Sequence, residues 1–162
     1  MKDRDKRKVL FLCTGNSARS ILAEYLLRSM DPRFETWSAG AEPTGRVHPM
    51  ASKVLRDAYG IDVTGARSKS WEAVEDVDFD VVVTVCEHAR NTCPLLPSSP
   101  AIQAFWGSPD PAGASGTEAE VEAAFRRVAD EIHQRLESFC ALPFDGLERE
   151  ELTRRIRALG GG

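Results

Sequence analysis

The sequence predicts one α/β domain in which a four-stranded parallel sheet is flanked by helices. Short runs rich in β-branched and aromatic residues alternate with stretches of helical periodicity, which is typical of this class. The run VVVTV at residues 81–85 has no polar alternation, as expected of a central strand buried on both faces. The 162 residues contain no repeat, linker or second domain. We therefore expect a single domain over residues 1–162, with residues 1–7 and 160–162 frayed.

Four strands are expected along the chain. They are residues 8–12, 34–38, 80–85 and 102–106. The first strand leads directly into Cys13, and the third leads into Cys86. Ligands of open parallel sheets bind outside the carboxyl ends of the strands. Three loops are therefore expected to meet at one edge of the sheet: 13–20, 86–93 and 106–113.

The first two predicted helices follow the first two strands. Residues 20–30 carry apolar side chains at helical spacing. The face that we expect to be buried consists of Leu22, Tyr25, Leu26 and Ser29. A proline suits the first turn of a helix and a glycine suits its end, so Pro49 and Gly60 predict a second helix over residues 49–60. Its inward face is expected to contain Met50, Val54 and Ala58.

The longest predicted helix begins near residue 117. Thr117 and Glu120 have the spacing of a capping box, in which each side chain bonds the backbone N–H of the other residue. Apolar residues then recur every three or four positions: Val121, Phe125, Val128, Ile132, Leu136 and Phe139. A shorter helix is expected after Pro143, with Asp145 and Glu148 as a second capping pair. Its buried residues would be Leu152, Ile156 and Leu159.

Composition excludes several classes of function. The net charge is −4, from 21 Lys and Arg against 25 Asp and Glu, and basic residues do not interleave with aromatic ones. Nucleic acid is therefore not an expected partner. No apolar run approaches the ~20 residues of a membrane span, and the amino terminus does not resemble a signal peptide. We expect a cytoplasmic monomer whose four cysteines serve chemistry rather than structure.

The segment CTGNSARS, residues 13–20, is the strongest functional motif. It lies between a strand and a helix, so the backbone N–H groups of the loop and the helix macrodipole would converge on a tetrahedral anion. Arg19 adds a charged, planar guanidinium, and Cys13 would act as a thiolate nucleophile toward phosphorus or arsenic. The alternative is a buried apolar cysteine at a strand end. The oxyanion-binding residues of this phosphate-binding loop would be Thr14, Gly15, Asn16, Ser17, Ala18, Arg19 and Ser20.

Three other residues have two interpretations each. Asp110, between two prolines, is either a proton donor to a leaving oxygen or an ordinary turn residue. Cys86 and Cys93 are seven positions apart. In a helix their Cα atoms would be about 10.5 Å apart, whereas a disulfide tolerates about 7 Å, so a bond would require the segment to leave the helix. From the residues alone, two unrelated buried thiols are the favoured interpretation.

These motifs together resemble the low-molecular-weight protein tyrosine phosphatase fold and, within it, the thioredoxin-coupled arsenate reductases. The wider resemblance rests on the loop C-x-G-N-x-x-R-S, the Ala-Glu that follows it and a late Asp-Pro. The narrower one rests on WSAG, GIDVT, VTVCEHARNTCP and WGSPDPAG, which begin at residues 37, 60, 83 and 106. The resemblance covers about residues 9–140.

The resemblance implies a thiol–disulfide relay. Cys13 would attack arsenate while Asp110 protonates the departing oxygen. Cys86 would then attack Cys13 and release arsenite, and Cys93 would close a disulfide with Cys86. Thioredoxin or a related thiol reductant would restore the enzyme, and phosphate or sulfate would compete with arsenate. Two other functions stay open: a phosphatase acting on phosphomonoesters, and an oxyanion- or redox-sensing module without turnover.

Two departures from the family pattern matter. Ala18 stands where many relatives have a second cysteine in the loop, so no disulfide can form inside it. Some relatives also bind potassium through residues that match Asn16, Glu24 and Ser38, together with an acidic residue. Lys69 aligns with that acid, so its ammonium would take the place of the cation and pair with Glu24. We therefore expect no potassium dependence and no other cofactor.

Other residues receive simpler interpretations. His88 with the two neighbouring cysteines forms C-x-H-x4-C, which lacks a fourth ligand and matches no common zinc pattern, so no metal is expected. Cys140 follows Phe139 at the end of the long helix and is expected in the core. His48 precedes Pro49 and is expected where the second helix begins.

Overall fold

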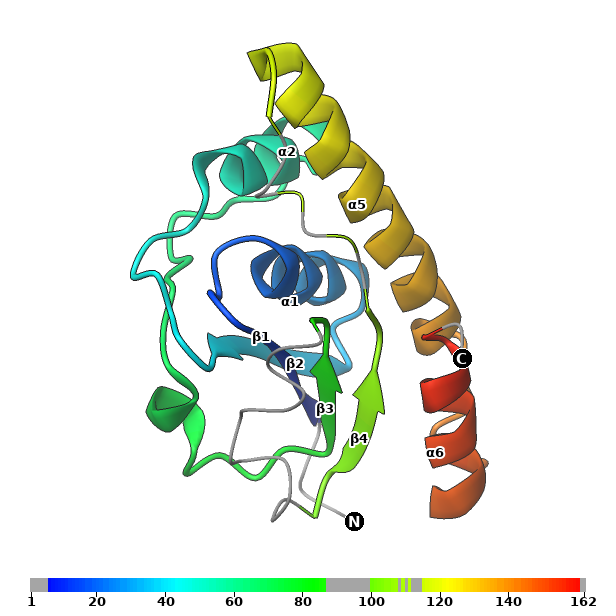
Figure 1. Ribbon diagram of the computed structural model, residues 1–162. Coiled ribbons are helices and arrows are strands. Elements are labelled where there is room, and N and C mark those ends of the chain that lie inside the picture. The colour runs from blue at the N-terminus through cyan, green and yellow to red at the C-terminus, as the bar shows by residue number, and fades with distance from the viewer. Residues whose placement is uncertain (1–5, 87–99, 108, 110, 112–114, 161–162) are drawn as a thin grey trace.

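The computed structural model describes residues 6–86, 100–107, 109, 111 and 115–160. Within this part of the chain, four parallel strands form one sheet in the order β2-β1-β3-β4 (Figure 1). The strands are β1 Arg7–Cys13, β2 Phe34–Gly40, β3 Val81–Thr84 and β4 Ile102–Phe105. All four predicted strands are confirmed, with ends that differ by one or two residues.

The register of the central strand fixes the edge of the sheet at which the site forms. On β1, Leu12 pairs with Ala39 of β2 and with Thr84 of β3, and Cys13 pairs with Gly40. The carboxyl ends of three strands therefore finish at one level. All of β3 is buried, as its uninterrupted apolar run predicts.

The side chains of β1 alternate between two hydrophobic clusters, one on each face of the sheet. Val9, Phe11 and Cys13 belong to the cluster that includes buried residues of α1, α2, α5 and α6. Leu10 and Leu12 belong to the cluster on the opposite face, which includes Val74 and Phe79. The alternation places the Cys13 side chain on the face that α1 covers.

The helices that cover this face are α1 Arg19–Met30, α2 Pro49–Tyr59, α5 Glu118–Cys140 and α6 Arg149–Ala158 (Figure 1). A short 3-10 helix, η1 Trp71–Val74, contributes to the opposite face. In the part of the chain that the structure describes, no helix is both long and apolar enough to cross a membrane.

Two predictions about the buried faces of α1 and α2 are wrong. Ser29 is exposed, and its hydroxyl donates to the carbonyl oxygen of Leu26. Ala58 is exposed as well, because the last turn of α2 lies beyond the core and leaves residues 56–58 in solvent. Gly60 ends α2 in the left-handed conformation, with φ 67°, as predicted.

The capping box at the start of α5 is confirmed. The hydroxyl of Thr117 accepts from the N–H of Glu120 at 3.1 Å, and the Glu120 carboxylate accepts from the N–H of Thr117 at 2.8 Å. The predicted α5 face is buried, except that Val121 is only half-buried.

The second predicted capping pair is wrong. The first residue of α6 is Arg149, and Glu148 precedes it without a side-chain cap. The carboxylate of Asp145 instead binds Arg7, 3.0 Å away, at the other end of the sequence. Leu152 and Ile156 are buried as predicted, and Leu159 is half-buried.

Candidate active site

The phosphate-binding loop connects β1 to α1, and its carbonyl oxygens point toward another part of the chain. We call residues 41–48, which connect β2 to α2, the backing segment. Its backbone N–H groups donate to four loop carbonyls: Ala41 to Cys13 at 3.1 Å, Glu42 to Thr14 at 2.8 Å, Thr44 to Gly15 at 3.0 Å and His48 to Ser17 at 2.8 Å. In a trans peptide the N–H points opposite to the carbonyl. The N–H groups that follow these carbonyls, those of Thr14, Gly15, Asn16 and Ala18, are therefore turned away from the backing segment. The N–H of Thr14 points to Cys86, and the other three point toward the interior of the loop.

Asn16 makes the turn that this arrangement needs. Its φ of 48° lies in the left-handed region, which asparagine tolerates better than most residues. The buried side chain accepts from the N–H of Lys69 at 2.7 Å and donates to the hydroxyl of Ser20 at 2.8 Å. The loop is thus fixed both to a distant segment and to the first turn of α1.

The Cys13 sulfur is buried and lies among hydrogen-bond donors. It accepts from the N–H of Asn16 at 3.2 Å and contacts the hydroxyl oxygen of Ser20 at 3.0 Å. Because that hydroxyl already accepts from Asn16, its own hydrogen is available to the sulfur. Donors directed at a sulfur in this way are the surroundings that a nucleophilic cysteine requires.

Cys86 reaches the same loop from β3. The N–H of Val85 donates to the carbonyl of Leu12 at 2.8 Å, which extends the pairing of β3 with β1. The buried Cys86 sulfur then accepts from the N–H of Thr14 at 3.0 Å and lies 3.1 Å from the Thr14 hydroxyl. Thr14 directly follows Cys13, so the structure brings both cysteines to one end of β1. Both are free thiols.

The amino terminus of α1 completes the described part of the site. Arg19 is its first residue and is half-buried. Ala18 occupies the cap position and cannot provide a side-chain cap, and the first turn carries no acidic residue. The N–H groups of a helix terminus without such a cap, together with the positive end of the macrodipole, favour a bound anion. Cys93, Asp110 and His88 lie outside the described residues.

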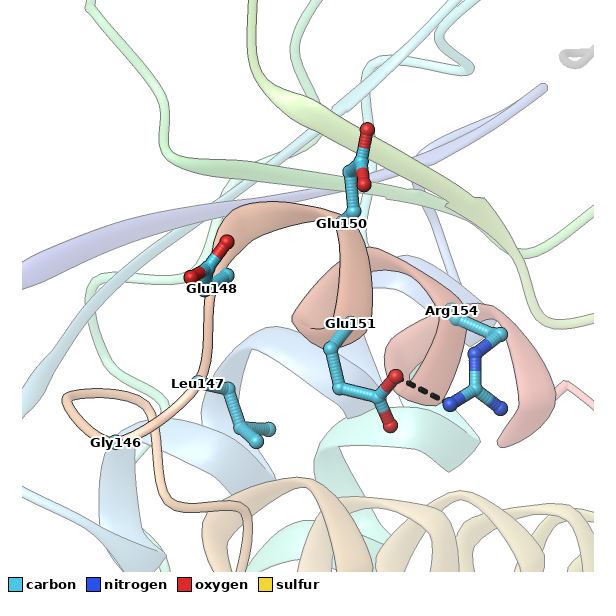
Figure 2. A pocket seen from close by; sticks show the side chains of 6 residues that line it. All are labelled: Gly146, Leu147, Glu148, Glu150, Glu151 and Arg154. Atoms are coloured by element: carbon cyan, nitrogen blue, oxygen red, sulfur yellow. Dashed lines mark hydrogen bonds and ion pairs between the residues drawn. The ribbon is translucent and has the colours of Figure 1, made fainter.

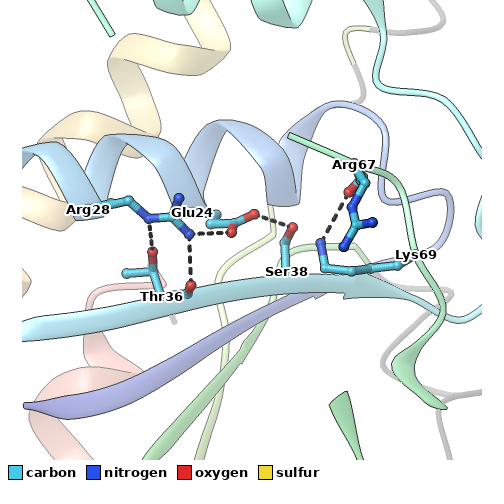
Figure 3. A network of polar contacts seen from close by, with 6 residues as sticks. All are labelled: Glu24, Arg28, Thr36, Ser38, Arg67 and Lys69. Carbon is cyan, nitrogen blue, oxygen red and sulfur yellow. Dashed lines mark hydrogen bonds and ion pairs between the residues drawn. The ribbon is translucent and has the colours of Figure 1, made fainter. Parts of the chain in front are cut away.

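A polar network joins α1 to β2 beside this loop (Figure 3). The buried Glu24 carboxylate accepts from the Ser38 hydroxyl at 2.6 Å and from the Arg28 guanidinium at 2.7 Å. Arg28 also donates to the hydroxyl and the carbonyl oxygen of Thr36. Burial raises the pKa of Glu24, and its hydrogen bond with Ser38 and the charges of Lys69 and Arg28 oppose that rise.

The geometry differs from the predicted direct pair between Lys69 and Glu24. The direct ion pair of Glu24 is with Arg28. The Lys69 ammonium donates to the carbonyl oxygen of Arg67 at 3.1 Å and acts on Glu24 only electrostatically (Figure 3). Partial burial lowers the pKa of Lys69, and the charge of Glu24 opposes that effect. Arg28 takes the carboxylate because it lies one turn after Glu24 on the same helix.

The residues that support the loop from behind were not predicted from the sequence. The Ser68 hydroxyl donates to the Gly15 carbonyl at 3.0 Å and accepts from the N–H of Gly45 at 3.1 Å. Gly40 leaves room for the loop, because a Cβ atom there would lie 2.6 Å from the carbonyl oxygen of Thr14. The glycine that ends the WSAG segment was the one visible signal of this contact.

A hollow at the start of α6 is a different kind of surface (Figure 2). Its lining residues are Gly146, Leu147, Glu148, Glu150, Glu151 and Arg154. Glu151 is paired with Arg154 and Arg155, which lower its pKa. Three carboxylates around this hollow repel anions. It is therefore not the candidate oxyanion site.

The fold and the loop define a class: an α/β protein with a cysteine at the carboxyl end of its central strand and an anion-binding turn before the first helix. The family model for low molecular weight phosphotyrosine protein phosphatase matches residues 8–155, and the chain belongs to this family. The predicted fold class is thereby confirmed.

Similar proteins within the family are arsenate reductases. The arsenate reductase of Halalkalibacterium halodurans is 40% identical over 136 residues, which cover 83% of this chain and 96% of that protein. The arsenate reductase of Bacillus subtilis is 39% identical over 136 residues, with the same coverage.

Solved structures agree with these sequence matches. The crystal structure of arsenate reductase from Archaeoglobus fulgidus has a TM-score of 0.68 and 31% identity, and the match covers 83% of this chain and 99% of that one. An arsenate reductase in the phosphate binding state has a TM-score of 0.70 and 30% identity, over 83% of this chain and 97% of that one.

Proposed function

We propose that this protein reduces arsenate to arsenite, with Cys13 as the nucleophile and Cys86 as the second thiol. One observation carries the proposal: both sulfur atoms accept hydrogen bonds from backbone N–H groups of the same loop. Cys13 accepts from the N–H of Asn16, and Cys86 accepts from the N–H of Thr14. Arsenate reductases about 40% identical over most of the chain support the reaction.

The first step forms a sulfur–arsenic bond. Arsenate binds to the inward N–H groups of the loop and to Arg19. The Cys13 thiolate attacks the arsenic atom, the bond from arsenic to one hydroxyl group breaks, and that hydroxyl departs as water after accepting a proton from Asp110. Arsenic remains As(V) in this adduct.

The second step transfers two electrons. The Cys86 thiolate attacks the Cys13 sulfur and forms a disulfide, while the pair of electrons in the sulfur–arsenic bond passes to arsenic. Arsenic is thereby reduced to As(III) and leaves as arsenite. The Cys93 thiolate then attacks Cys86, which releases Cys13 as a thiolate and leaves the disulfide between Cys86 and Cys93.

A dithiol reductant closes the cycle by reducing that disulfide. We propose thioredoxin, or a related thiol reductant, acting on the protein in the cytoplasm. The supporting argument is chemical, because reducing compartments keep thiols available and thiol exchange needs no other cofactor.

Hydrolysis of phosphomonoesters is the second candidate function. The family is that of low molecular weight phosphotyrosine protein phosphatases, and the loop that would hold arsenate is equally suited to phosphate. Both reactions would use Cys13 as the nucleophile, together with Arg19 and Asp110. Cys86 and Cys93 would have no role in hydrolysis. We therefore expect phosphate and sulfate to compete with arsenate.

One assay separates these functions. Arsenite formed per enzyme is followed over time with thioredoxin, its reductase and NADPH, and is compared with hydrolysis of an aryl phosphate. A reductase gives many equivalents of arsenite, a phosphatase gives only hydrolysis, and a sensing module stops after one equivalent.

We also propose that the enzyme needs no monovalent cation. The positive charges of Lys69 and Arg28 already act on the buried Glu24 carboxylate, where a cation would otherwise be required.

A further inference from the structure

We infer that His48 is a positioning residue of the anion site. It holds the carbonyl of Ser17 outward and thereby directs the N–H of Ala18 into the phosphate-binding loop. This inference rests on the proposed binding of an oxyanion by the loop.

The backbone geometry carries the first part of the argument. The N–H of His48 donates to the Ser17 carbonyl oxygen at 2.8 Å. The peptide between Ser17 and Ala18 is planar, so the N–H of Ala18 points the opposite way, toward the interior of the loop. Ala18 is buried and is the cap residue of α1. Its N–H therefore lies where the helix terminus attracts an anion.

The side chain of His48 holds that donor in place. Its Nδ1 accepts from the N–H of Met50 at 3.1 Å, which caps the start of α2 and requires that Nδ1 carry no proton. Its ring packs against Phe125 of α5, with the ring centroids 4.6 Å apart. Phe125 is fully buried. The donor to the loop is thus fixed by two helices at once.

The other donors of the backing segment are Ala41, Glu42 and Thr44, which lie in different surroundings. Glu42 and Thr44 are exposed, and Ala41 is half-buried with only a methyl side chain. His48 consequently connects the packing of α2 against α5 with the orientation of a loop N–H. Residue 48 should influence anion affinity although its side chain need not touch the anion.

Three substitutions separate the backbone role from the side-chain role. His48 has φ −63°, which is the angle that proline imposes, so His48→Pro removes both the N–H and the ring without changing this torsion, and its comparison with His48→Ala isolates the N–H. His48→Ala keeps the N–H and removes the ring. His48→Asn keeps the N–H and supplies another side chain that caps helices well.

The test is the dissociation constant of inorganic phosphate for the reduced, full-length protein, measured by calorimetry. We expect His48→Pro to weaken phosphate binding about tenfold, because the hydrogen bond from the Ala18 N–H to the anion is lost. His48→Ala should weaken binding about threefold, because that bond is lost in part, and His48→Asn less than twofold, because it is nearly retained. Aryl phosphate hydrolysis should show the loss in KM more than in kcat.

His133 offers the matched control. It stacks on Tyr59, also between α5 and α2, with ring centroids 5.4 Å apart. His133→Ala should lower the thermal midpoint as His48→Ala does, but leave phosphate affinity unchanged. Wild-type affinity in His48→Pro overturns the inference. If that variant does not fold, equal affinities of His48→Ala and the wild type overturn it instead. Failure of the wild type to bind phosphate would refute the proposed function itself.

Discussion

Cys13 and Cys140 are thiols of the same chain in opposite surroundings. The Cys13 sulfur faces hydrogen-bond donors from Asn16 and Ser20. The Cys140 thiol is half-buried and hydrogen-bonded to the carboxylate of Asp31, which is an acceptor. Burial, reinforced by that carboxylate, raises the pKa of Cys140 to about 11. The neighbouring groups, more than the residue type, decide which thiol can be a nucleophile.

The same contrast supports the proposed ordered relay in a protein with four cysteines. A thiol that stays protonated near neutral pH neither attacks arsenic nor exchanges with a disulfide. Arg33 pairs with Asp31 and donates to the Cys140 carbonyl oxygen at 2.8 Å, and its positive charge opposes the rise in the pKa of Cys140 less strongly than burial and Asp31 cause it. We propose that Cys140 has no role in the reaction.

The largest expected effect is that of removing the nucleophile. Cys13→Ser should lower both arsenate reduction and aryl phosphate hydrolysis by at least about a thousandfold, because a hydroxyl in place of the thiolate is a far weaker nucleophile. Cys140→Ser should change either rate less than twofold. A large loss of activity in Cys140→Ser would break the comparison.

The next effect concerns the relay alone. Cys93→Ser should abolish repeated turnover with thioredoxin but leave hydrolysis of an aryl phosphate nearly unchanged, because hydrolysis uses no disulfide. Steady-state arsenite production and phosphatase assays on one preparation would measure this. Equal loss of both activities would contradict the relay.

A smaller effect is expected behind the loop. Gly40→Ala places a methyl group 2.6 Å from the Thr14 carbonyl oxygen, so the loop must shift and both activities should fall about tenfold or more. Gly65→Ala is the control, because no atom lies within 4 Å of its Cβ position. Normal kinetics in Gly40→Ala would show that the loop tolerates displacement.

Reactivity of Cys140 is the next comparison to sharpen. With a pKa of about 11, only about one molecule in a thousand carries the thiolate at pH 8. Asp31→Asn removes the negative charge, which lowers the pKa, raises the thiolate fraction and should speed alkylation by iodoacetamide several-fold. Mass spectrometry of the Cys140 peptide over time would measure the rate, and an unchanged rate would show that burial alone protects this thiol.

The smallest effect is expected for monovalent cations. Exchange of sodium for potassium at constant ionic strength should change the activity less than twofold, because Lys69 and Arg28 already act on Glu24. A rise of several-fold would refute the replacement of the cation by Lys69.

Much of this architecture could be predicted from local sequence. The buried run of β3, the capping box of Thr117 and Glu120, and the loop around Cys13 each depend on neighbours within a few positions. The predicted capping pair of Asp145 and Glu148 is wrong because the Asp145 carboxylate binds Arg7, which lies 138 positions away. The predicted burial of Ala58 is wrong because hydrophobic periodicity does not show where the core ends.

The support of the site could not be predicted for a related reason. The backing segment acts through backbone N–H groups, which every residue except proline has, so its side chains give no signal. The contact of Cys86 with Thr14 likewise depends on the register between β3 and β1. The sequence motifs indicated the chemistry, whereas the fold determined which groups meet.

The most direct test of the account maps disulfides after one turnover without reductant. The reduced protein is mixed with arsenate, alkylated and analysed by mass spectrometry of its peptides. We expect a Cys86–Cys93 disulfide with Cys13 and Cys140 alkylated, and a trapped Cys13–Cys86 disulfide in Cys93→Ser. A disulfide that contains Cys140, or four free thiols beside released arsenite, would contradict the account.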